Sequence, residues 1–237
     1  EPIGKVAKEL FGRGEYATMA EFVGTVTVDA LFAALTAATP HDLLAVVPLL
    51  EWNANLDQVI AELPDAQVHQ IATALTPEEL AELALALDPS RIGPIVAAVP
   101  AETVAGIARA LFERREYAGM AVFVSVVTPE MLRAALGVAS AGDLLAVVPL
   151  LEWTPQIDAV VDDLPDSTLD GLFAEIAQGA DWDAAKAAFE RLGPTAQQRL
   201  FARFGRLSAA NQKRIRTAAE AGELGSAAAA LMAGSTT

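Results

Sequence analysis

The sequence predicts an all-α protein, an α-solenoid or superhelical bundle of short helices with an internal duplication. Its 237 residues are 53% hydrophobic but only 6% aromatic, since alanine and leucine dominate, and these two are strong helix formers. Apolar residues recur at helical spacing, as at Leu80, Leu83, Ala84 and Leu87, and no window alternates as a strand would. The chain also repeats itself at an offset of 101 residues, which is typical of helical-repeat architectures.

The duplication is clearest in one decapeptide. The run LLAVVPLLEW occupies residues 43–52 and returns unchanged at residues 144–153. Residues around it recur in the same register: Phe11, Arg13, Glu15, Tyr16, Met19 and Phe22 become Phe112, Arg114, Glu116, Tyr117, Met120 and Phe123. The duplicated segments are residues 3–76 and 104–177, which we call the first and second copy.

The decapeptide is expected to form a helix that its central proline kinks or splits, because proline cannot donate a helical backbone hydrogen bond. In the second copy it is followed by Thr154-Pro155, a pair typical of an N-cap and a first helical position. The preceding helix is therefore expected to end near Trp153. Asn53 is the expected cap at the matching place of the first copy.

Other helix starts have similar signals. In Thr76-Pro77-Glu78-Glu79 the threonine can cap, the proline fits the first helical position, and the acids complement the helix dipole. This start opens a helical pair over residues 77–101 that joins the copies. Thr128-Pro129-Glu130 has the same pattern. Beyond the duplication, three more helices are expected to begin at Asp181, Pro194 and Ser208.

We expect three parts: residues 1–101 as a first repeat unit with linking helices, residues 102–178 as a second repeat unit, and residues 179–237 as a basic helical cap. Charge distinguishes the last part. Residues 186–216 hold eight basic residues and one acid, a net charge of +7, whereas the chain as a whole carries −15 and the remainder therefore −22.

Composition also excludes several classes of function. The absence of cysteine rules out disulfides, thiolate catalysis and cysteine-ligated metals, and it suits a reducing, cytoplasmic location. No stretch approaches the about 20 apolar residues of a membrane-spanning helix. The acidic body argues against nucleic acid as a partner. No phosphate loop, dinucleotide fingerprint or nucleophile motif is present, so the sequence nominates no catalytic residue, cofactor or metal ligand.

The segment LTPEELAELALALDPSRIGPIVAAVP, residues 75–100, resembles the N-terminal superhelical domain of MgtE-type magnesium transporters. The middle domain of the flagellar motor switch protein FliG has a similar spacing of helix caps and leucines. Both domains stack short helices that open with xPEE- or DP-type caps and close with leucines. The likeness is clearest over residues 60–105 and weaker over 160–178. The resemblance implies a superhelical fold and a magnesium-sensing role.

The duplicated aromatic residues are candidates for binding. Glu51 and Trp52, with Glu152 and Trp153, could form two equivalent sites in which tryptophan supplies apolar contact and glutamate a charge. The alternative is a tightly packed helix that tolerates few substitutions. Tyr16 and Tyr117 also occupy equivalent places. Their hydroxyls suit the mouth of a pocket, or a buried helix end with one hydrogen bond.

The basic cap offers a second candidate. Arg199, Arg203 and Arg206 form one stripe of an expected helix whose other side is apolar. This stripe could meet an anionic lipid surface or a phosphorylated partner, or it could close the stack against the chain's own acids. His41 and His69 lack metal-site spacing. The acids Asp158, Asp162, Asp163, Asp166 and Asp170 could hold a hard cation or act as solvated helix faces and caps.

These features together favour a non-enzymatic helical-repeat module that binds a protein partner along a groove between stacked helices. An alternative is a carrier or sensor of an apolar, lipid-like small molecule in a cavity between the two halves. A third hypothesis is a domain that senses a divalent cation, magnesium. Peripheral contact with a membrane also fits the arginine stripe.

Overall fold

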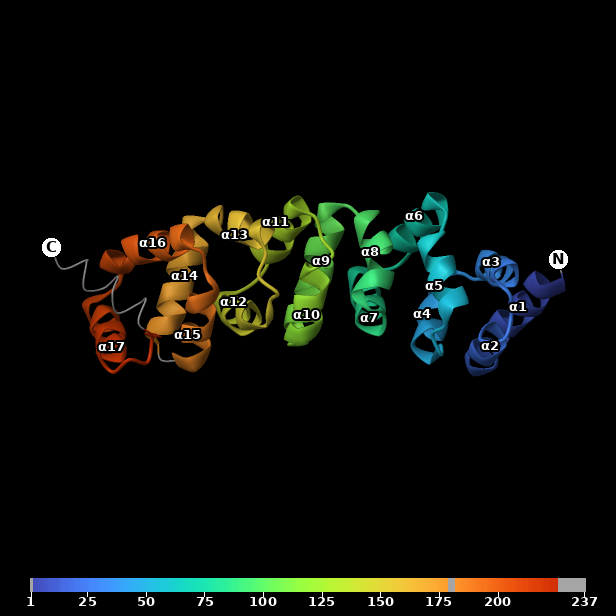
Figure 1. The fold of residues 1–237 in the computed structure, drawn as a ribbon, viewed down its shortest axis with the longest axis horizontal. Coiled ribbons are helices and arrows are strands. Elements are labelled where there is room, and N and C mark those ends of the chain that lie inside the picture. Colours follow the sequence, from blue (N-terminus) through green and yellow to red (C-terminus); the bar gives the residue numbers. More distant parts are fainter. Residues whose placement is uncertain (1, 179–181, 226–237) are drawn as a thin grey trace. The chain divides into compact units, whose positions relative to one another are not determined.

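The computed structural model describes residues 2–178 and 182–225, and in these ranges the chain forms seventeen α-helices, three short 3-10 helices and no strand (Figure 1). The prediction of an all-α fold is therefore confirmed. The chain divides into two compact units, Glu1–Ala110 (unit 1) and Leu111–Thr237 (unit 2). Each unit is a stack of short helices joined by tight turns.

Unit 1 contains α1 (Pro2–Gly12), α2 (Tyr16–Val23), α3 (Val28–Ala37), α4 (Pro40–Val46), η1 (Val47–Leu49), α5 (Ala54–Ala61), α6 (Asp65–Ala74), α7 (Pro77–Ala86), α8 (Pro89–Ala97) and most of α9 (Ala101–Glu113). α1 packs against α3, α3 against α5, and α5 against α8, while α2 packs against α4 and α4 against both α6 and α7. The core of the first helices is apolar, with Ala7, Met19 and Leu31 almost fully buried.

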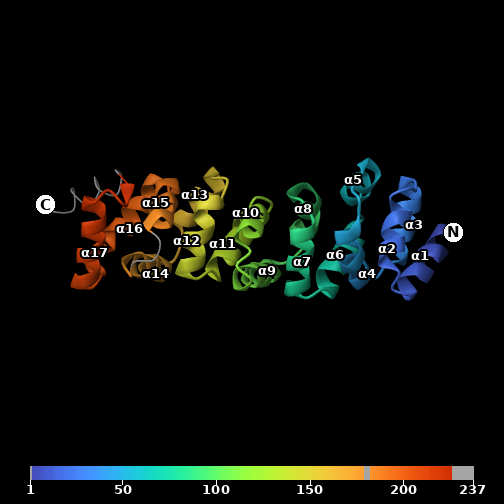
Figure 2. The same ribbon diagram turned by 90° about the horizontal axis from the view of Figure 1, so that it is seen from below.

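Unit 2 continues with α10 (Tyr117–Val124), α11 (Pro129–Gly137), α12 (Ala141–Val147), η2 (Val148–Leu150), α13 (Pro155–Asp162), α14 (Asp166–Ala177), α15 (Trp182–Arg191), α16 (Pro194–Ala202), η3 (Phe204–Arg206) and α17 (Ala209–Glu220). α10 packs against α12, α12 against α14 and α15, α13 against α16, and α14 against α17 (Figure 2). Helices α15–α17 therefore belong to the same compact unit as the second copy. Phenylalanines on α14, α15, α16 and η3 cluster between these helices (Phe173, Phe189, Phe201 and Phe204).

The predicted helix starts are confirmed where a cap was expected. Thr76 and Glu79 form a reciprocal capping box, since the Glu79 amide donates to Thr76 Oγ1 at 3.2 Å and the Thr76 amide donates to Glu79 Oε2 at 2.8 Å. The side chains of four more predicted caps accept hydrogen bonds from first-turn amides: Asn53, Thr128, Thr154 and Ser208. The expected start at Asp181 lies outside the described residues.

The decapeptide is split rather than kinked, and its helix ends earlier than the expected Trp153. α4 stops at Val46 and α12 at Val147, and each is followed by one 3-10 turn through the proline. Proline has no amide hydrogen to continue the α-helical pattern, so the chain tightens to 3-10 and then becomes extended at Leu50 and Leu151.

The expected single helix after Pro194 is also interrupted. α16 ends at Ala202, Arg203 is its C-cap, and Phe204–Arg206 form a 3-10 turn around Gly205. Glycine is unfavourable inside a helix, which explains the break. Arg199, Arg203 and Arg206 therefore do not lie on one continuous helix.

None of the helices described could cross a membrane, because the longest of them, α9, has 13 residues and a span needs about 20.

Candidate functional site

The two copies of the decapeptide line small apolar cavities. In unit 1, Leu43, Val46, Val47, Leu50 and Trp52 border a cavity of about 70 Å³. In unit 2, Leu144, Leu145, Val148 and Leu151 of the decapeptide border one of about 40 Å³, together with side chains of α14–α16. A water molecule in the liquid takes about 30 Å³ and a cavity that holds benzene about 150 Å³, so neither cavity has room for a lipid chain. The decapeptide therefore serves mainly as packing surface at these places.

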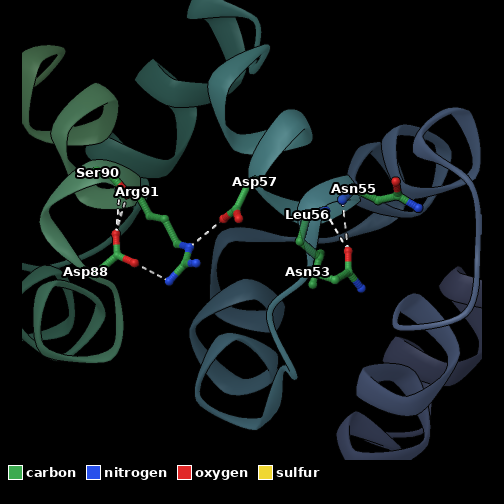
Figure 3. A network of polar contacts seen from close by, with 7 residues as sticks. All are labelled: Asn53, Asn55, Leu56, Asp57, Asp88, Ser90 and Arg91. Atoms are coloured by element: carbon green, nitrogen blue, oxygen red, sulfur yellow. Dashed lines mark hydrogen bonds and ion pairs between the residues drawn. The ribbon is translucent and has the colours of Figure 1, made fainter.

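In unit 1, Trp52 is tied to α8 through Arg91. The Arg91 guanidinium lies over the indole ring, 4.4 Å from its centroid, and its Nε donates to Asp57 Oδ1 at 2.7 Å. Asp88, the N-cap of α8, also pairs with Arg91 and accepts from Ser90 Oγ at 2.6 Å. Figure 3 shows this network beside the Asn53 cap of α5. Hydrogen bonding to Asp57 raises the pKa of Arg91, and the hydrogen bond from Ser90 lowers the pKa of Asp88.

In unit 2, the equivalent tryptophan makes a different contact to the equivalent acid. Trp153 Nε1 donates directly to Asp158 Oδ1 at 2.7 Å. Gly193, the N-cap of α16, sits so close that a Cβ at this position would lie 2.7 Å from the same oxygen. Both tryptophans are half-buried and bonded within their own unit, whereas the neighbouring Glu51 and Glu152 are exposed.

The two tyrosines occupy matching hydrogen-bond networks. Tyr16 Oη donates to Asp42 Oδ1, and Tyr117 Oη donates to Asp143 Oδ1, each at 3.2 Å. The same carboxylates complete the capping boxes of α4 and α12. Burial raises the pKa of each phenol above its usual value, and the neighbouring aspartate raises it by a smaller amount, so both hydroxyls stay protonated. The tyrosines therefore hold helix ends and do not line the pocket described below.

Two of the three arginines of the basic stripe are engaged inside unit 2. Arg203 is 8% exposed, and its guanidinium binds Asp170 at 2.5 Å and Asp166 at 2.6 Å. Arg199 Nη2 donates to the Leu164 carbonyl at 2.8 Å and lies 3.5 Å from Asp166. Arg206 is exposed. The pair Arg199 and Arg203 thus fastens α16 to α14, which matches the intramolecular alternative.

The candidate histidines and acids do not lie together as a metal site in the described part of the chain. His41 lies 3.4 Å from Glu79, and His69 is exposed on α6. Asp163 pairs with Arg133 at 2.9 Å. Within residues 2–178 and 182–225, no group of three histidine or acidic side chains is arranged to hold a metal ion.

A larger hollow beside the decapeptide is a pocket of about 450 Å³ in unit 2, which we call the α10–α13 pocket. Its walls come from the end of α10 and from the segment that joins η2 to α13. The lining residues are Ala121, Val124, Ser125, Leu151, Glu152, Thr154, Pro155, Gln156 and Ile157. A volume of this size is typical of sites that accept a small ligand or a few side chains.

Most polar side chains around this pocket are used within the protein. Ser125 Oγ donates to the Val122 carbonyl at 2.6 Å, and Gln156 Nε2 donates to the Val127 carbonyl at 3.0 Å. Thr154 Oγ1 accepts from the Ile157 amide at 3.3 Å. In the described part of the chain, the Glu152 carboxylate has no hydrogen-bond or ion-pair partner. Glu152 is also the one charged group of the lining. Because its carboxylate has no partner among the described residues, it is available to a ligand.

The matching place in unit 1 is spanned by a side chain. Asn53 stands where unit 2 has Thr154, and its Nδ2 reaches the Gly24 carbonyl at 3.5 Å. Asn55 Nδ2 donates to the Val26 carbonyl at 3.2 Å, as Gln156 does to Val127. Asn53 thus bonds to the end of α2, whereas among the described residues the Thr154 side chain makes no such bond to the end of α10.

Comparison of the chain with models of known protein families, with curated proteins and with solved structures gives no match. The fold and the pocket define the class: an all-α protein of stacked short helices, with an open pocket on its second unit.

Sequence reasoning found part of this site. It singled out Glu152, which lines the pocket, and Glu51, Trp52 and Trp153, which do not. It missed Ser125, Gln156 and the wall residues of α10. It also missed Arg91, because the contact of α8 with α5 joins residues 34 positions apart. The offset of 101 residues could have pointed to the pocket, since it aligns Asn53 with Thr154 and so marks a position where the copies differ.

Proposed function

We propose that this protein is a non-enzymatic helical-repeat module that binds a segment of a protein partner, and that the α10–α13 pocket receives that segment. The observation that carries the proposal is the pocket of about 450 Å³ on the duplicated motif, with the partnerless Glu152 at its edge. Stacked helices suit this role because their turns create recesses without any chemistry.

The lining of the pocket supports binding of a peptide-like segment. Its walls are apolar at Ala121, Val124, Leu151 and Ile157, and its edge is polar. Protein-binding recesses combine such an apolar floor with a few polar groups at the rim. The rival role as a lipid carrier has less support, because the apolar cavities of about 40 and 70 Å³ are too small for a lipid chain.

The magnesium-sensing role implied by the resemblance to MgtE-type transporters has less support from the side-chain contacts. Four of the five acids that could have held a cation contact arginine or tryptophan, as Asp166 and Asp170 do with Arg203.

A displayed library of random peptides, selected on the purified protein, tests the proposal. Selected peptides are then measured by fluorescence anisotropy on wild type, Ser125→Trp and Gly24→Trp. Ser125 and Gly24 are exposed C-caps at equivalent positions, but only Ser125 lines the pocket. An indole at residue 125 should fill the pocket and weaken binding by about tenfold or more, whereas Gly24→Trp should leave the affinity unchanged.

Two outcomes would overturn the proposal: a selection that yields no saturable binder, or peptides that bind Ser125→Trp as tightly as wild type. Far-ultraviolet circular dichroism of both variants shows whether the helices remain intact.

A further inference from the structure

We infer that the α10–α13 pocket selects a basic side chain, lysine or arginine, whose carbon stem lies on the apolar walls and whose charge meets Glu152. This inference rests on the proposed function and adds the chemistry of the recognised residue.

The charge of the pocket favours a basic side chain. Glu152 is its one charged lining group and has no partner among the residues described. A carboxylate is acceptor-only, so it requires a donor from the ligand. Ammonium and guanidinium groups supply strong, charge-assisted donors to a carboxylate.

Glu152 lies beside apolar walls. Leu151 is 2% exposed, and Val124 and Ile157 are also buried, so the floor is hydrocarbon. Lysine and arginine carry three or four methylene groups below their charge, and they bury these stems while the charged end stays near water. A pocket with an apolar floor and an acid at its edge matches that division of the side chain.

The start of α13 also lines the pocket, and the start of a helix can attract an anion when its amides are free. Its first turn offers few donors. Pro155 has no amide hydrogen, the Ile157 amide is capped by Thr154 Oγ1, and the Asp158 amide donates to the Thr154 carbonyl. Within the described residues this leaves the Gln156 amide as the remaining first-turn donor. One amide beside the Glu152 carboxylate does not make an anion site, so the pocket favours a cation.

The charge of the whole chain also favours a basic ligand. A net charge of −15 draws a basic segment toward the protein and speeds its encounter. Because Asn53 spans the corresponding place in unit 1, the inference assigns one basic-residue site to the chain rather than two.

Methyl NMR titration with single-residue probes tests this. The probes are the Nα-acetyl methylamides of lysine, arginine, norleucine and glutamate, and the signals are those of Val124, Leu151 and Ile157. On wild type, the lysine and arginine probes should shift these methyls and bind about two- to fivefold more tightly than the norleucine probe, the range of a partly exposed ion pair.

Glu152→Gln should remove this preference, because the amide keeps the shape of the side chain and loses the charge. Glu51→Gln is the matched control at the equivalent position of the first copy, and it should leave the preference intact. Equal binding of lysine and norleucine probes, a preference that survives in Glu152→Gln, tighter binding of the glutamate probe, or no shift of these methyls would each overturn the inference. The proposed function is judged separately, since peptides selected without a basic residue that still lose affinity in Ser125→Trp would uphold it.

Discussion

Among single residues, one left-handed backbone position is occupied by glycine in the first copy and by arginine in the second. Arg115 has a φ of 58°, in the left-handed region, and Gly14 takes a φ of 67° at the matching place of the first copy. Both positions end a helix and reverse the chain. Glycine reaches this conformation without the steric cost that a side chain meets, about 1–2 kcal/mol. The second copy therefore carries strain that the first copy lacks.

Arg115→Gly should raise the free energy of unfolding by about 0.5 kcal/mol, because relief of the strain exceeds the about 0.5–1 kcal/mol that glycine costs in chain entropy. Gly14→Arg, the reverse change in the first copy, should lower it. Urea unfolding measures both. Since the charge of Arg115 lowers the pKa of Tyr117, Arg115→Gly should also raise the pKa of that phenol in an ultraviolet titration. A lower free energy of unfolding in Arg115→Gly, or a higher one in Gly14→Arg, would show that the turn is not strained.

Arg203 is the second feature at the scale of single residues, because it joins α16 to α14 through Asp166 and Asp170. Its hydrogen bonds lower the pKa of both carboxyls below the usual 3.8. A carboxyl with a lowered folded pKa stabilises the fold above its unfolded pKa, and this contribution is lost as the pH falls through the folded value.

Asp170→Asn should therefore lower the melting temperature at pH 7, and the difference from wild type should shrink as the pH falls below about 4. Asp65→Asn in unit 1 is the control, since Asp65 begins α6 as Asp166 begins α14 but has no arginine partner in the described residues. Melting curves across pH check this, and a difference that persists unchanged at low pH would contradict it.

At the scale of the element, identical residues are buried to different extents. Leu144, Leu145 and Leu151 are buried in unit 2, whereas Leu43, Leu44 and Leu50 are half-buried in unit 1. The helices that follow explain the difference. α14–α16 contribute Phe173, Phe189 and Phe201, while α6–α8 contain no phenylalanine, tyrosine or tryptophan, and Ala72 stands at the position of Phe173.

We expect backbone amides of α6–α8 to exchange with solvent faster than those of α14–α16, because fewer apolar contacts resist local opening. Hydrogen exchange read by mass spectrometry measures this for each helix. Phe173→Ala should cost about 3–5 kcal/mol and bring exchange in α14 toward that of α6. Slower exchange in α6–α8 than in α14–α16 would show that ring packing does not set local stability here.

At the scale of the whole molecule, the chain consists of two compact units, and each holds its own core. In stacked helical repeats, stability is roughly a sum of terms from each repeat and its neighbours. Because Leu43, Leu44 and Leu50 are less buried than their counterparts in unit 2, we expect unit 1 to be the less stable of the two.

Unit 1 should unfold at a lower urea concentration than unit 2. The three tryptophans allow a direct test: Trp153→Phe with Trp182→Phe leaves Trp52 to report on unit 1, and Trp52→Phe leaves reporters in unit 2. The Trp52 fluorescence should change first. Coincident transitions would show that the units unfold as one.

The local structure of this protein follows from short-range signals in its sequence. The helices follow from alanine and leucine content and from apolar spacing, and their starts follow from caps such as Thr76, Thr128 and Thr154, because these signals act within one helical turn. The tertiary structure decided which acid contacts which base and where a pocket stays open. Arg91 reaches Asp57, and Arg203 reaches Asp170, only because stacking brings distant helices together. Three leucines of the same decapeptide are buried in unit 2 and half-buried in unit 1, since their burial depends on the side chains that other helices place against them.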